Sequence, residues 1–237
     1  LKGLTLKTEL STDYNLNKTK TYQPDYKFGV RENSQRDGAW YKNDTKYWSW
    51  RNILTYNGTI AEKHNINVMA GQEMSQSYWE NFAASNSGYL SNSVTDLIAG
   101  ATTGANINLT QGNQDGYKLY SYFGRALYNY ADRYLLTATL RCDGSNKFAE
   151  GHRWGWFPSA AFAWRASQEN FLKDNKVINN LKLRLGWGAT GNQNVQQWAY
   201  AAMLKNYTTS WGVGVMNANN ANPELKWETT YSTNVGF

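Results

Sequence analysis

Hydrophobic and polar residues alternate with a period of two along most of the chain, and this pattern predicts β-strands. Each predicted strand has an apolar or aromatic face and a polar, often charged, face. In the segment 134–141, Tyr134, Leu136 and Leu140 share one face, whereas Thr137 and Arg141 share the other. The alternation predicts eight strands, over residues 4–14, 47–60, 66–74, 120–130, 134–141, 154–165, 181–187 and 227–237. A soluble β-sandwich would show the same alternation, so the pattern predicts an all-β fold without identifying what meets the apolar faces.

The predicted connections alternate between short and long. Residues 61–65 and 131–133 form tight turns, and residues 167–180 form a medium connection with a single helical turn around 169–173. Hairpin loops of soluble proteins usually take about 2–5 residues, whereas long loops at one end and short turns at the other are typical of outer-membrane barrels. The long connections are rich in Asn, Gly, Ser and Thr and cover residues 15–46, 82–116, 143–153 and 190–226. We therefore expect an antiparallel transmembrane β-barrel segment with long extracellular loops and short periplasmic turns.

The aromatic residues support the same architecture because they fall at two levels of the predicted strands. Trp and Tyr carry a large apolar body with one polar tip, and they form girdles at both interfaces of membrane barrels. The level near the long loops contains Trp48, Trp50, Trp154, Trp156 and Trp187, and the level near the short turns contains Tyr56, Tyr128, Tyr130, Tyr134 and Trp164.

The composition narrows the function classes. Aromatic residues make up 15% of the chain, with 11 Trp and 17 Tyr, and 20 Gly stand against 3 Pro, which favours β structure over disorder. The net charge of +6 comes from Lys and Arg that are scattered rather than clustered, so no nucleic-acid partner is predicted. No apolar stretch approaches the roughly 18 residues of a transmembrane helix. The single cysteine, Cys142, excludes an internal disulfide and a cysteine-rich zinc site, and we expect no catalytic role for it.

Candidate enzyme and cofactor motifs are weak. The glycines of GWGATG, residues 186–191, match a dinucleotide fingerprint by spelling, but no Asp or Glu occurs between Asp174 and Glu224 to complete it. These glycines suit a strand in a tight barrel wall better. The two histidines, His64 and His152, belong to no HExxH motif and support no Ser-His-Asp set. We therefore predict no catalytic residue, no cofactor and no metal.

Four sequence blocks give the chain a resemblance to a known family. These are YNYADRYLLTATLRCDGSNKF (128–148), HRWGWFPSAAFAWRASQENFLKD (152–174), NLKLRLGWGATGNQ (180–193) and NPELKWETTYSTNVGF (222–237). In this order they resemble the C-terminal barrel of TonB-linked outer-membrane transporters of the SusC/RagA type. Residues 1–127 fit that family only by their pattern.

The resemblance implies a wide barrel of about 22 strands, of which this chain would supply eight. In that family the barrel holds an N-terminal plug, a TonB box couples the receptor to TonB, and a SusD-like surface lipoprotein closes the extracellular mouth. Oligosaccharides, and sometimes peptides, are the cargo, and the outer membrane of a Gram-negative, Bacteroidetes-like bacterium is the location. We expect residues 1–237 to be a partial barrel that lacks the plug, the TonB box, the signal peptide and the last strands. Its partners would then be outer-membrane lipids, the lipoprotein, TonB and the cargo.

Two sets of residues are candidates for functional contacts. Aromatic rings on the predicted extracellular loops can stack on sugar rings or contact a partner protein; they are Trp40, Tyr41, Trp198, Tyr200 and Trp211. Arginines on the polar faces of the strands would line the wet lumen or pair with carboxylates of the plug; they are Arg51, Arg125, Arg141, Arg165 and Arg184.

Three alternatives remain open at the level of the sequence. One is a TonB-dependent receptor for a siderophore or cobalamin. Another is a soluble β-sandwich that binds glycans through the tryptophans of its loops. A third is a glycosidase in which Asp143 and Glu150, close together on a loop beside Trp154 and Trp156, act as paired carboxylates.

Overall fold

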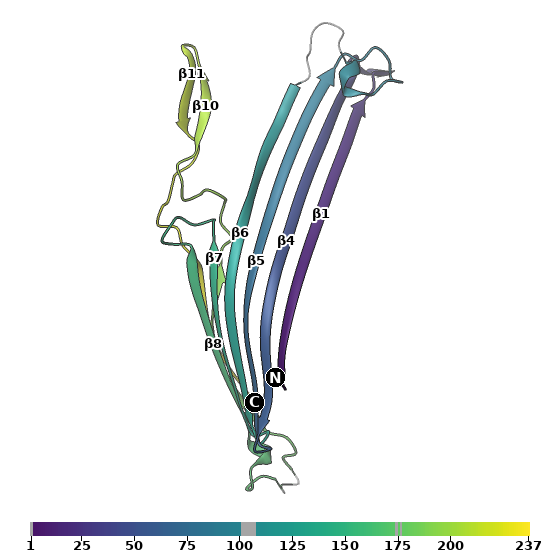
Figure 1. Cartoon of the computed structure of the whole chain (residues 1–237). Helices are drawn as coiled ribbons and strands as arrows, with labels where there is room; N and C mark the ends of the chain where they lie inside the picture. The colour runs from purple at the N-terminus through teal and green to yellow at the C-terminus, as the bar shows by residue number, and fades with distance from the viewer. Residues whose placement is uncertain (1, 101–107, 174, 176) are drawn as a thin grey trace. The chain divides into compact units, whose positions relative to one another are not determined.

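The chain folds almost entirely into β-strands in a computed structural model that describes residues 2–100, 108–173, 175 and 177–237 (Figure 1). Eight strands form one sheet in the order β1-β4-β5-β6-β7-β8-β9-β12. Their bounds are β1 Leu4–Gln23, β4 Asp37–Ile60, β5 His64–Ser87, β6 Asn108–Tyr130, β7 Tyr134–Ser145, β8 Trp154–Arg165, β9 Lys182–Asn192 and β12 Glu228–Gly236. This confirms the predicted number of sheet strands and the predicted all-β class.

Short elements occupy four of the connections. Two small hairpins form separate two-stranded sheets, and two 3₁₀ turns lie between strands of the main sheet. The hairpins are β2 Tyr26–Phe28 with β3 Arg31–Asn33 and β10 Leu204–Thr209 with β11 Gly212–Asn217, and the 3₁₀ turns are η1 Leu97–Ala99 and η2 Ala166–Gln168.

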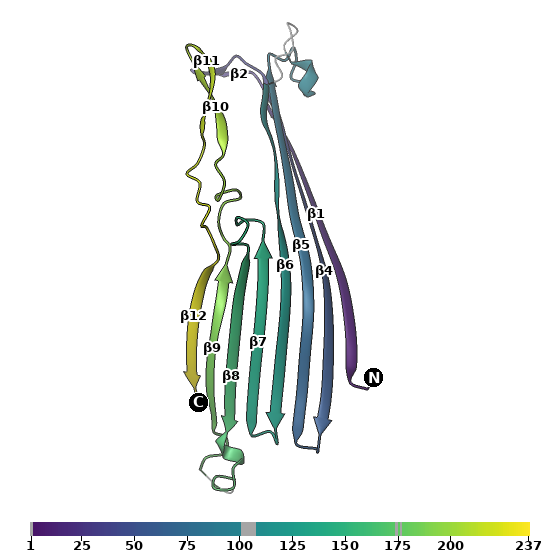
Figure 2. The same cartoon turned by 60° about the vertical axis from the view of Figure 1, so that its left-hand side comes forward.

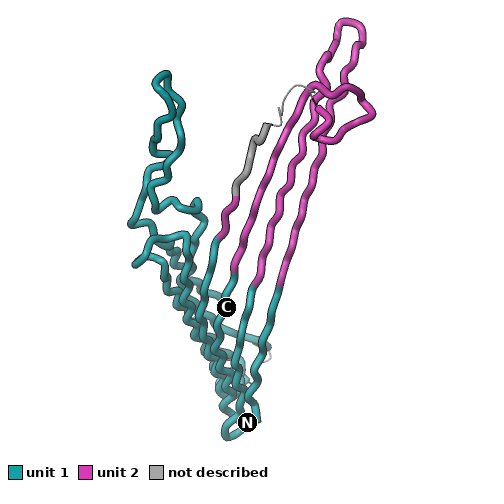
Figure 3. Tube along the Cα trace, turned by 45° about the horizontal axis from the view of Figure 1, so that its top comes forward, with its two compact units in different colours: residues 1–11, 49–75, 117–237 teal, residues 12–48, 76–116 magenta. Residues whose placement is uncertain are grey.

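Two compact units divide the chain (Figure 3). Unit 1 contains residues 1–11, 49–75 and 117–237, and unit 2 contains residues 12–48 and 76–116. In unit 1, β7, β8, β9 and β12 lie side by side, and each neighbouring pair among them is antiparallel (Figure 2). Unit 1 carries all of the four sequence blocks that resemble the transporter family.

Several predicted loops are wrong in their bounds because the strands continue through them. β1, β4, β5 and β6 contain 20, 24, 24 and 23 residues, about twice the 9–11 that cross a membrane. Much of the predicted loops 15–46 and 82–116 is therefore strand, although residues 101–107 lie outside the described part. Backbone pairing continues through these residues, in which the regular alternation that predicts strands is lost. The predicted loops 143–153 and 190–226 shorten in the same way, since β7 ends at Ser145 and β9 at Asn192.

The short connections confirm the predicted turns. Residues 61–63 and 131–133 are tight turns in which Ala61, Glu62, Ala131 and Asp132 all have positive φ, between 47° and 56°. Both residues at the tip of each hairpin are thus left-handed, as the right-handed twist of paired strands favours. The predicted helical turn near residue 169 is also present, because the Lys173 amide donates to the Glu169 carbonyl at 2.9 Å.

In unit 1, the apolar face of the sheet is the more exposed face and the polar face is the more buried one, which is the reverse of a soluble protein. On β7, Leu136 and Leu140 are 47% and 46% exposed, whereas Thr137 and Arg141 on the opposite face are half-buried. No described segment covers the apolar face as a second layer would in a sandwich. The same exposed face includes Leu6, Leu10, Leu54, Tyr122, Phe162, Leu185 and Val235. Contact between water and a whole sheet face of large apolar side chains is unfavourable. These side chains are therefore placed for contact with an apolar solvent.

A small aromatic core closes the long-loop end of unit 1. Phe148 is fully buried, and the rings of Phe148 and Phe157 lie 5.4 and 5.3 Å from the ring of Trp227. The Trp227 indole donates to the Arg153 carbonyl at 2.8 Å. A Cβ on Gly191 would lie 2.1 Å from the Phe157 ring. The GWGATG glycines thus lie in strand β9, where at least Gly191 makes room for this core, and no helix follows them among the described residues.

Among the described residues, no helix has the length and apolar character needed to cross a membrane.

Candidate functional site: the polar face and the rim loops

The polar face of unit 1 holds a bidentate ion pair between β4 and β5. The Arg51 guanidinium donates to both carboxylate oxygens of Glu73, at 3.0 and 3.2 Å. Side-chain alternation predicts that each of these residues faces the polar side, but only the pairing of the two strands brings them together. A fork-to-fork pair of this kind fixes the orientation of both side chains.

A second polar cluster lies on β6 and β7. Arg141 Nε donates to Asp143 Oδ2 at 2.8 Å, and Arg141 Nη2 donates to Ser121 Oγ at 2.9 Å. Ser121 and Asp143 are directly paired across the strands and are almost fully buried. The Arg141 guanidinium also lies 5.6 Å from the centre of the Phe123 ring. Arg141 thus satisfies one carboxylate oxygen of Asp143 and the Ser121 hydroxyl, whereas the buried Asp143 Oδ1 atom has no hydrogen-bond partner among the described residues.

Three further predicted arginines share the face of Arg141. The register pairs Arg125 with Thr139, Ala163 with Arg184 and Arg165 with Lys182, so alternation places all three on this side of the sheet. All three are exposed, and their guanidinium groups form no hydrogen bond or ion pair with a described residue. Their guanidinium groups are therefore available to a ligand or to another part of a longer protein.

Two predicted loop aromatics lie in a strand instead. Trp40 and Tyr41 belong to β4, which begins at Asp37, so their assignment to an extracellular loop is wrong. The Lys20 ammonium lies 4.0 Å from the centre of the Trp40 ring, which occupies one face of that ring. Tyr41 is 49% exposed. The same extension of β4 places Trp48 and Trp50 inside the strand and not at its start.

The other three aromatics lie in the connection between β9 and β12. Trp198 lies in a turn with a φ of 63°, and its ring centre is 6.1 Å from that of Tyr200. Trp211 lies at the tip of the hairpin formed by β10 and β11 and is 97% exposed. A tryptophan with its whole ring in water is available for a partner or a sugar ring.

Unit 2 contains a clasp that the sequence does not predict. Arg36 donates to both Asp25 oxygens, at 2.8 and 2.7 Å, and to the carbonyls of Tyr89 and Leu90. The hydrogen bond from Arg36, with a second from Asn92, holds the pKa of Asp25 below its usual value. Residues far apart in sequence meet here, and no local pattern marks them. The clasp joins the connection after β1 to the connection after β5.

The glycosidase alternative finds no support in the geometry. Asp143 lies in strand β7 and not on a loop, and its carboxylate is paired with Arg141. Glu150 is exposed, and the structure gives it no ion pair with a described residue. His152 contacts Glu224 at 3.4 Å, His64 contacts the Tyr128 hydroxyl at 2.7 Å, and the described residues contain no cluster suited to a metal ion.

Known proteins that resemble this chain in sequence include TonB-dependent receptors. The model of the TonB dependent receptor-like β-barrel family matches residues 2–237. TonB-dependent receptor SusC of Bacteroides thetaiotaomicron is 44% identical over 127 residues, 50% of this chain and 13% of SusC. TonB-dependent receptor P39 of Formosa agariphila is 30% identical over 238 residues, 99% of this chain and 22% of P39. The chain thus spans less than a quarter of these receptors.

Solved structures share the fold. The structure of the RagAB peptide transporter matches 99% of this chain and 26% of the matched chain, with a TM-score of 0.91 and 23% identity. The RagAB peptide importer in its 'open-open' state matches 100% of this chain and 26% of that chain, with a TM-score of 0.90 and 24% identity. These relatives are named as receptors and a transporter.

Proposed function

This chain belongs to the TonB-dependent receptor β-barrel family, and from that premise we propose that it forms part of the wall of a SusC-like transporter. The transporter imports oligosaccharides or peptides across the outer membrane of a Bacteroidetes-like bacterium. The observation that carries the proposal is the exposure of the two faces of unit 1. Its apolar face is bare, and its polar face is tied together by ion pairs.

Each face has a separate role in this proposal. The apolar face contacts the hydrocarbon of the membrane, where every backbone group must find its partner within the sheet. The polar face lines the lumen, and Arg125, Arg165 and Arg184 offer guanidinium groups there that no described residue pairs with. Arg51 and Arg141 hold the wall in register through their carboxylate partners. Cargo passes along the polar face, and the energy for its passage comes from TonB through parts of the protein outside this chain.

The rim loops serve recognition in the same proposal. The resemblance to SusC-type transporters implies oligosaccharide cargo, whereas RagAB is a peptide transporter. Trp198, Tyr200 and Trp211 are suited to both classes of cargo, because an aromatic face stacks on a sugar ring and on an apolar side chain. A SusD-like lipoprotein is the expected partner at this rim.

Growth of the source bacterium tests the proposal. Deletion of the gene for the full-length receptor should abolish growth on one class of oligosaccharide or peptide as sole nutrient and leave growth on free glucose or amino acids unchanged. Restoring the gene should restore growth. Normal growth of the deletion strain on every oligosaccharide and peptide tested, with loss of growth only on limiting iron or cobalamin, would show that the cargo is a siderophore or cobalamin instead.

A further inference from the structure

The apolar face of unit 1 carries a groove beside the long-loop ends of β7 and β8. Its volume is about 550 Å³, and no charged side chain lines it. Ala70, Gly124 and Cys142 form its floor, and Cys142 is only 7% exposed. A Cβ on Gly124 would meet only the Met69 carbonyl, at 3.7 Å, so the space above this glycine is open. The groove therefore results from small residues on β5, β6 and β7 at positions where the rest of the face carries large ones.

Aromatic side chains form the walls of the groove. Tyr122, Cys142 and Trp156 are aligned across β6, β7 and β8, so two large rings flank the small cysteine. The rings of Tyr122 and Trp154 stack with centres 6.1 Å apart, above the backbone of Gly144. Tyr122 and Trp156 remain 55% and 63% exposed. The walls are thus largely apolar, and they are open on the side that faces away from the sheet.

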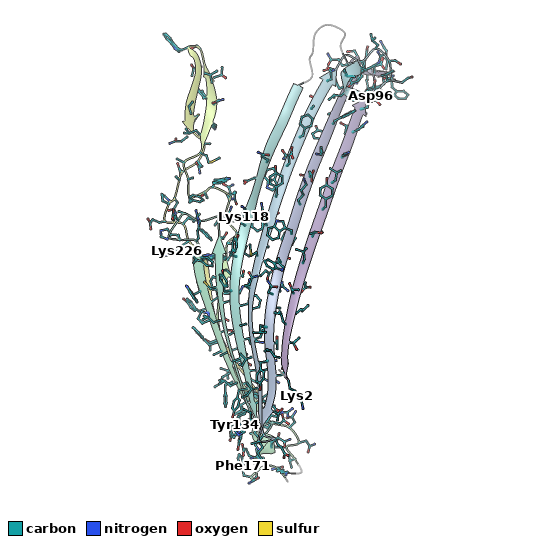
Figure 4. All side chains as sticks on the ribbon, viewed as in Figure 1. Lys2, Asp96, Lys118, Tyr134, Phe171 and Lys226 are labelled. Carbon is teal, nitrogen blue, oxygen red and sulfur yellow. The ribbon has the colours of Figure 1, made fainter. Side chains whose placement is uncertain are left out.

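Lys118 lies on the same strand and the same face, six residues before Gly124. Its side chain is exposed and forms no hydrogen bond or ion pair with a described residue (Figure 4). Six strand residues span about 20 Å, which at a strand tilt of 35–45° is a depth of roughly 15 Å. This depth is about half of the roughly 30 Å hydrocarbon core of a bilayer. An ammonium group and an apolar groove are thus separated by about the thickness of one leaflet.

We propose that this groove binds one acyl chain of an anionic membrane lipid whose phosphate group contacts Lys118. The proposal rests on the membrane placement of the apolar face given above. An apolar chain lies over Gly124 and against Leu140, and the rings of Tyr122 and Trp156 hold it on two sides. The acyl chain is surrounded by hydrocarbon both in the bilayer and in the groove, so its transfer between them changes the free energy little. The affinity of the site comes from closer packing in the groove and from the charge pair between the lipid phosphate and Lys118.

Photochemical labelling of the full-length receptor tests this site. The receptor is placed in nanodiscs of phosphatidylglycerol that contain a trace of the same lipid with a diazirine on its acyl chain, and the labelled residues are mapped by mass spectrometry. Labels should concentrate on residues 122–124 and 140–142. Gly124→Leu should lower labelling there about fivefold, because a leucine side chain replaces one or two buried CH₂ groups of the acyl chain.

Matched variants separate a site from general lipid contact. Ala160→Leu adds the same side chain to the same face outside the groove and should leave the labelling at residues 122–124 unchanged. Lys118→Gln should lower labelling by phosphatidylglycerol more than labelling by diazirine-labelled phosphatidylcholine, because the choline ammonium offsets the phosphate charge. Gly124→Ala keeps the test valid if the leucine prevents folding, and it too should lower the labelling.

Labels spread evenly over the apolar face, or equal losses in Gly124→Leu and Ala160→Leu, would overturn the proposal. The uptake proposal is untouched by that outcome, since growth measures it independently.

Discussion

At the scale of single residues, Glu169 is the acceptor at the centre of a polar cluster at the short-turn end of unit 1. Its carboxylate accepts hydrogen bonds from the Trp164 indole at 3.2 Å and from Arg133 at 3.3 Å. A hydrogen bond from the Tyr134 hydroxyl, then the one from Trp164, and the charge of Arg133 hold the pKa of Glu169 below its usual value. Figure 4 labels Tyr134 and Phe171 close together at this end. One carboxylate thus ties the turn before β7 to the connection after β8.

Glu169→Gln is expected to lower the unfolding temperature of the detergent-solubilised full-length receptor at pH 7. The carboxylate has a lowered pKa in the folded state, so its stabilisation is present above its unfolded value of about 4.5 and is lost as the pH falls through the lower folded value. The difference between wild type and variant should therefore shrink below about pH 4.5. Glu150→Gln is the control, since Glu150 is exposed at the opposite end of β8 and has no ion pair in the described structure. A difference that stays constant down to pH 3 would contradict this role of the charge.

At the scale of elements, each short hairpin contains two non-glycine residues in the left-handed region. Ala61 and Glu62 have φ values of 47° and 56° at the tip between β4 and β5. A side chain costs about 1–2 kcal/mol in this conformation relative to an unstrained one, and glycine avoids that cost. The hairpin geometry is therefore imposed by the pairing of two long strands, against the local preference of its tip residues.

Glu62→Gly should stabilise the barrel by about 0.5–1 kcal/mol, because it removes the left-handed strain at the tip. Lys63→Gly is the matched control. Lys63 has no positive φ, so the same replacement there only adds freedom to the unfolded chain and should destabilise. Urea unfolding of the full-length receptor in detergent, followed by tryptophan fluorescence, measures both changes. Equal changes in stability for Glu62→Gly and Lys63→Gly would show that the strain at Glu62 is relieved elsewhere in the structure.

The hairpin formed by β10 and β11 projects from the rim with Trp211 at its tip (Figure 1). Trp211 contributes nothing to the core, since it is 97% exposed. If the rim contacts the lipoprotein partner as proposed, Trp211→Ala should weaken that complex about 30-fold, the effect of losing a contact of about 2 kcal/mol, without changing the unfolding temperature. Val177→Ala, an 88% exposed residue in the connection after η2, should change neither. Co-purification and titration with the partner give the readout, and unchanged affinity would exclude Trp211 from the interface.

The sequence predicts the parts of the strands that have one apolar and one polar face, and it misses the extensions of these strands. Period-two alternation requires two different solvents, so it marks β8 to the residue and residues 134–141 of β7, but it misses residues 15–23 of β1 and residues 37–46 of β4. The shared face of the arginines follows from the same alternation. Their partners do not, because strand register decides that Arg51 meets Glu73 and that Ser121 lies beside Asp143. The clasp of Asp25 and Arg36 depends on loop conformation, which has no periodic signal.

At the scale of the whole molecule, the membrane assignment depends on which face of one sheet meets hydrocarbon. Ala138 and Thr139 are adjacent in the middle of β7, and they point to opposite faces. Ala138 is exposed on the apolar face and Thr139 is half-buried on the polar face. The same large charged side chain placed at these two positions therefore samples two environments at one depth in the sheet.

Ala138→Arg should destabilise the folded full-length receptor by about 2–4 kcal/mol, the cost of an arginine on the lipid face near the bilayer midplane. Thr139→Arg should cost much less, because the polar face offers water and carboxylates to the guanidinium. The fraction of receptor that keeps its folded, heat-modifiable mobility in electrophoresis after outer-membrane isolation measures both. In a soluble sandwich, arginine would also be destabilising wherever the apolar face is packed, but that destabilisation would not depend on the lipid. The membrane proposal therefore requires that the Ala138→Arg defect weaken in thinner bilayers, where position 138 lies closer to the interface. Equal tolerance of arginine at both positions would remove the basis for assigning either face.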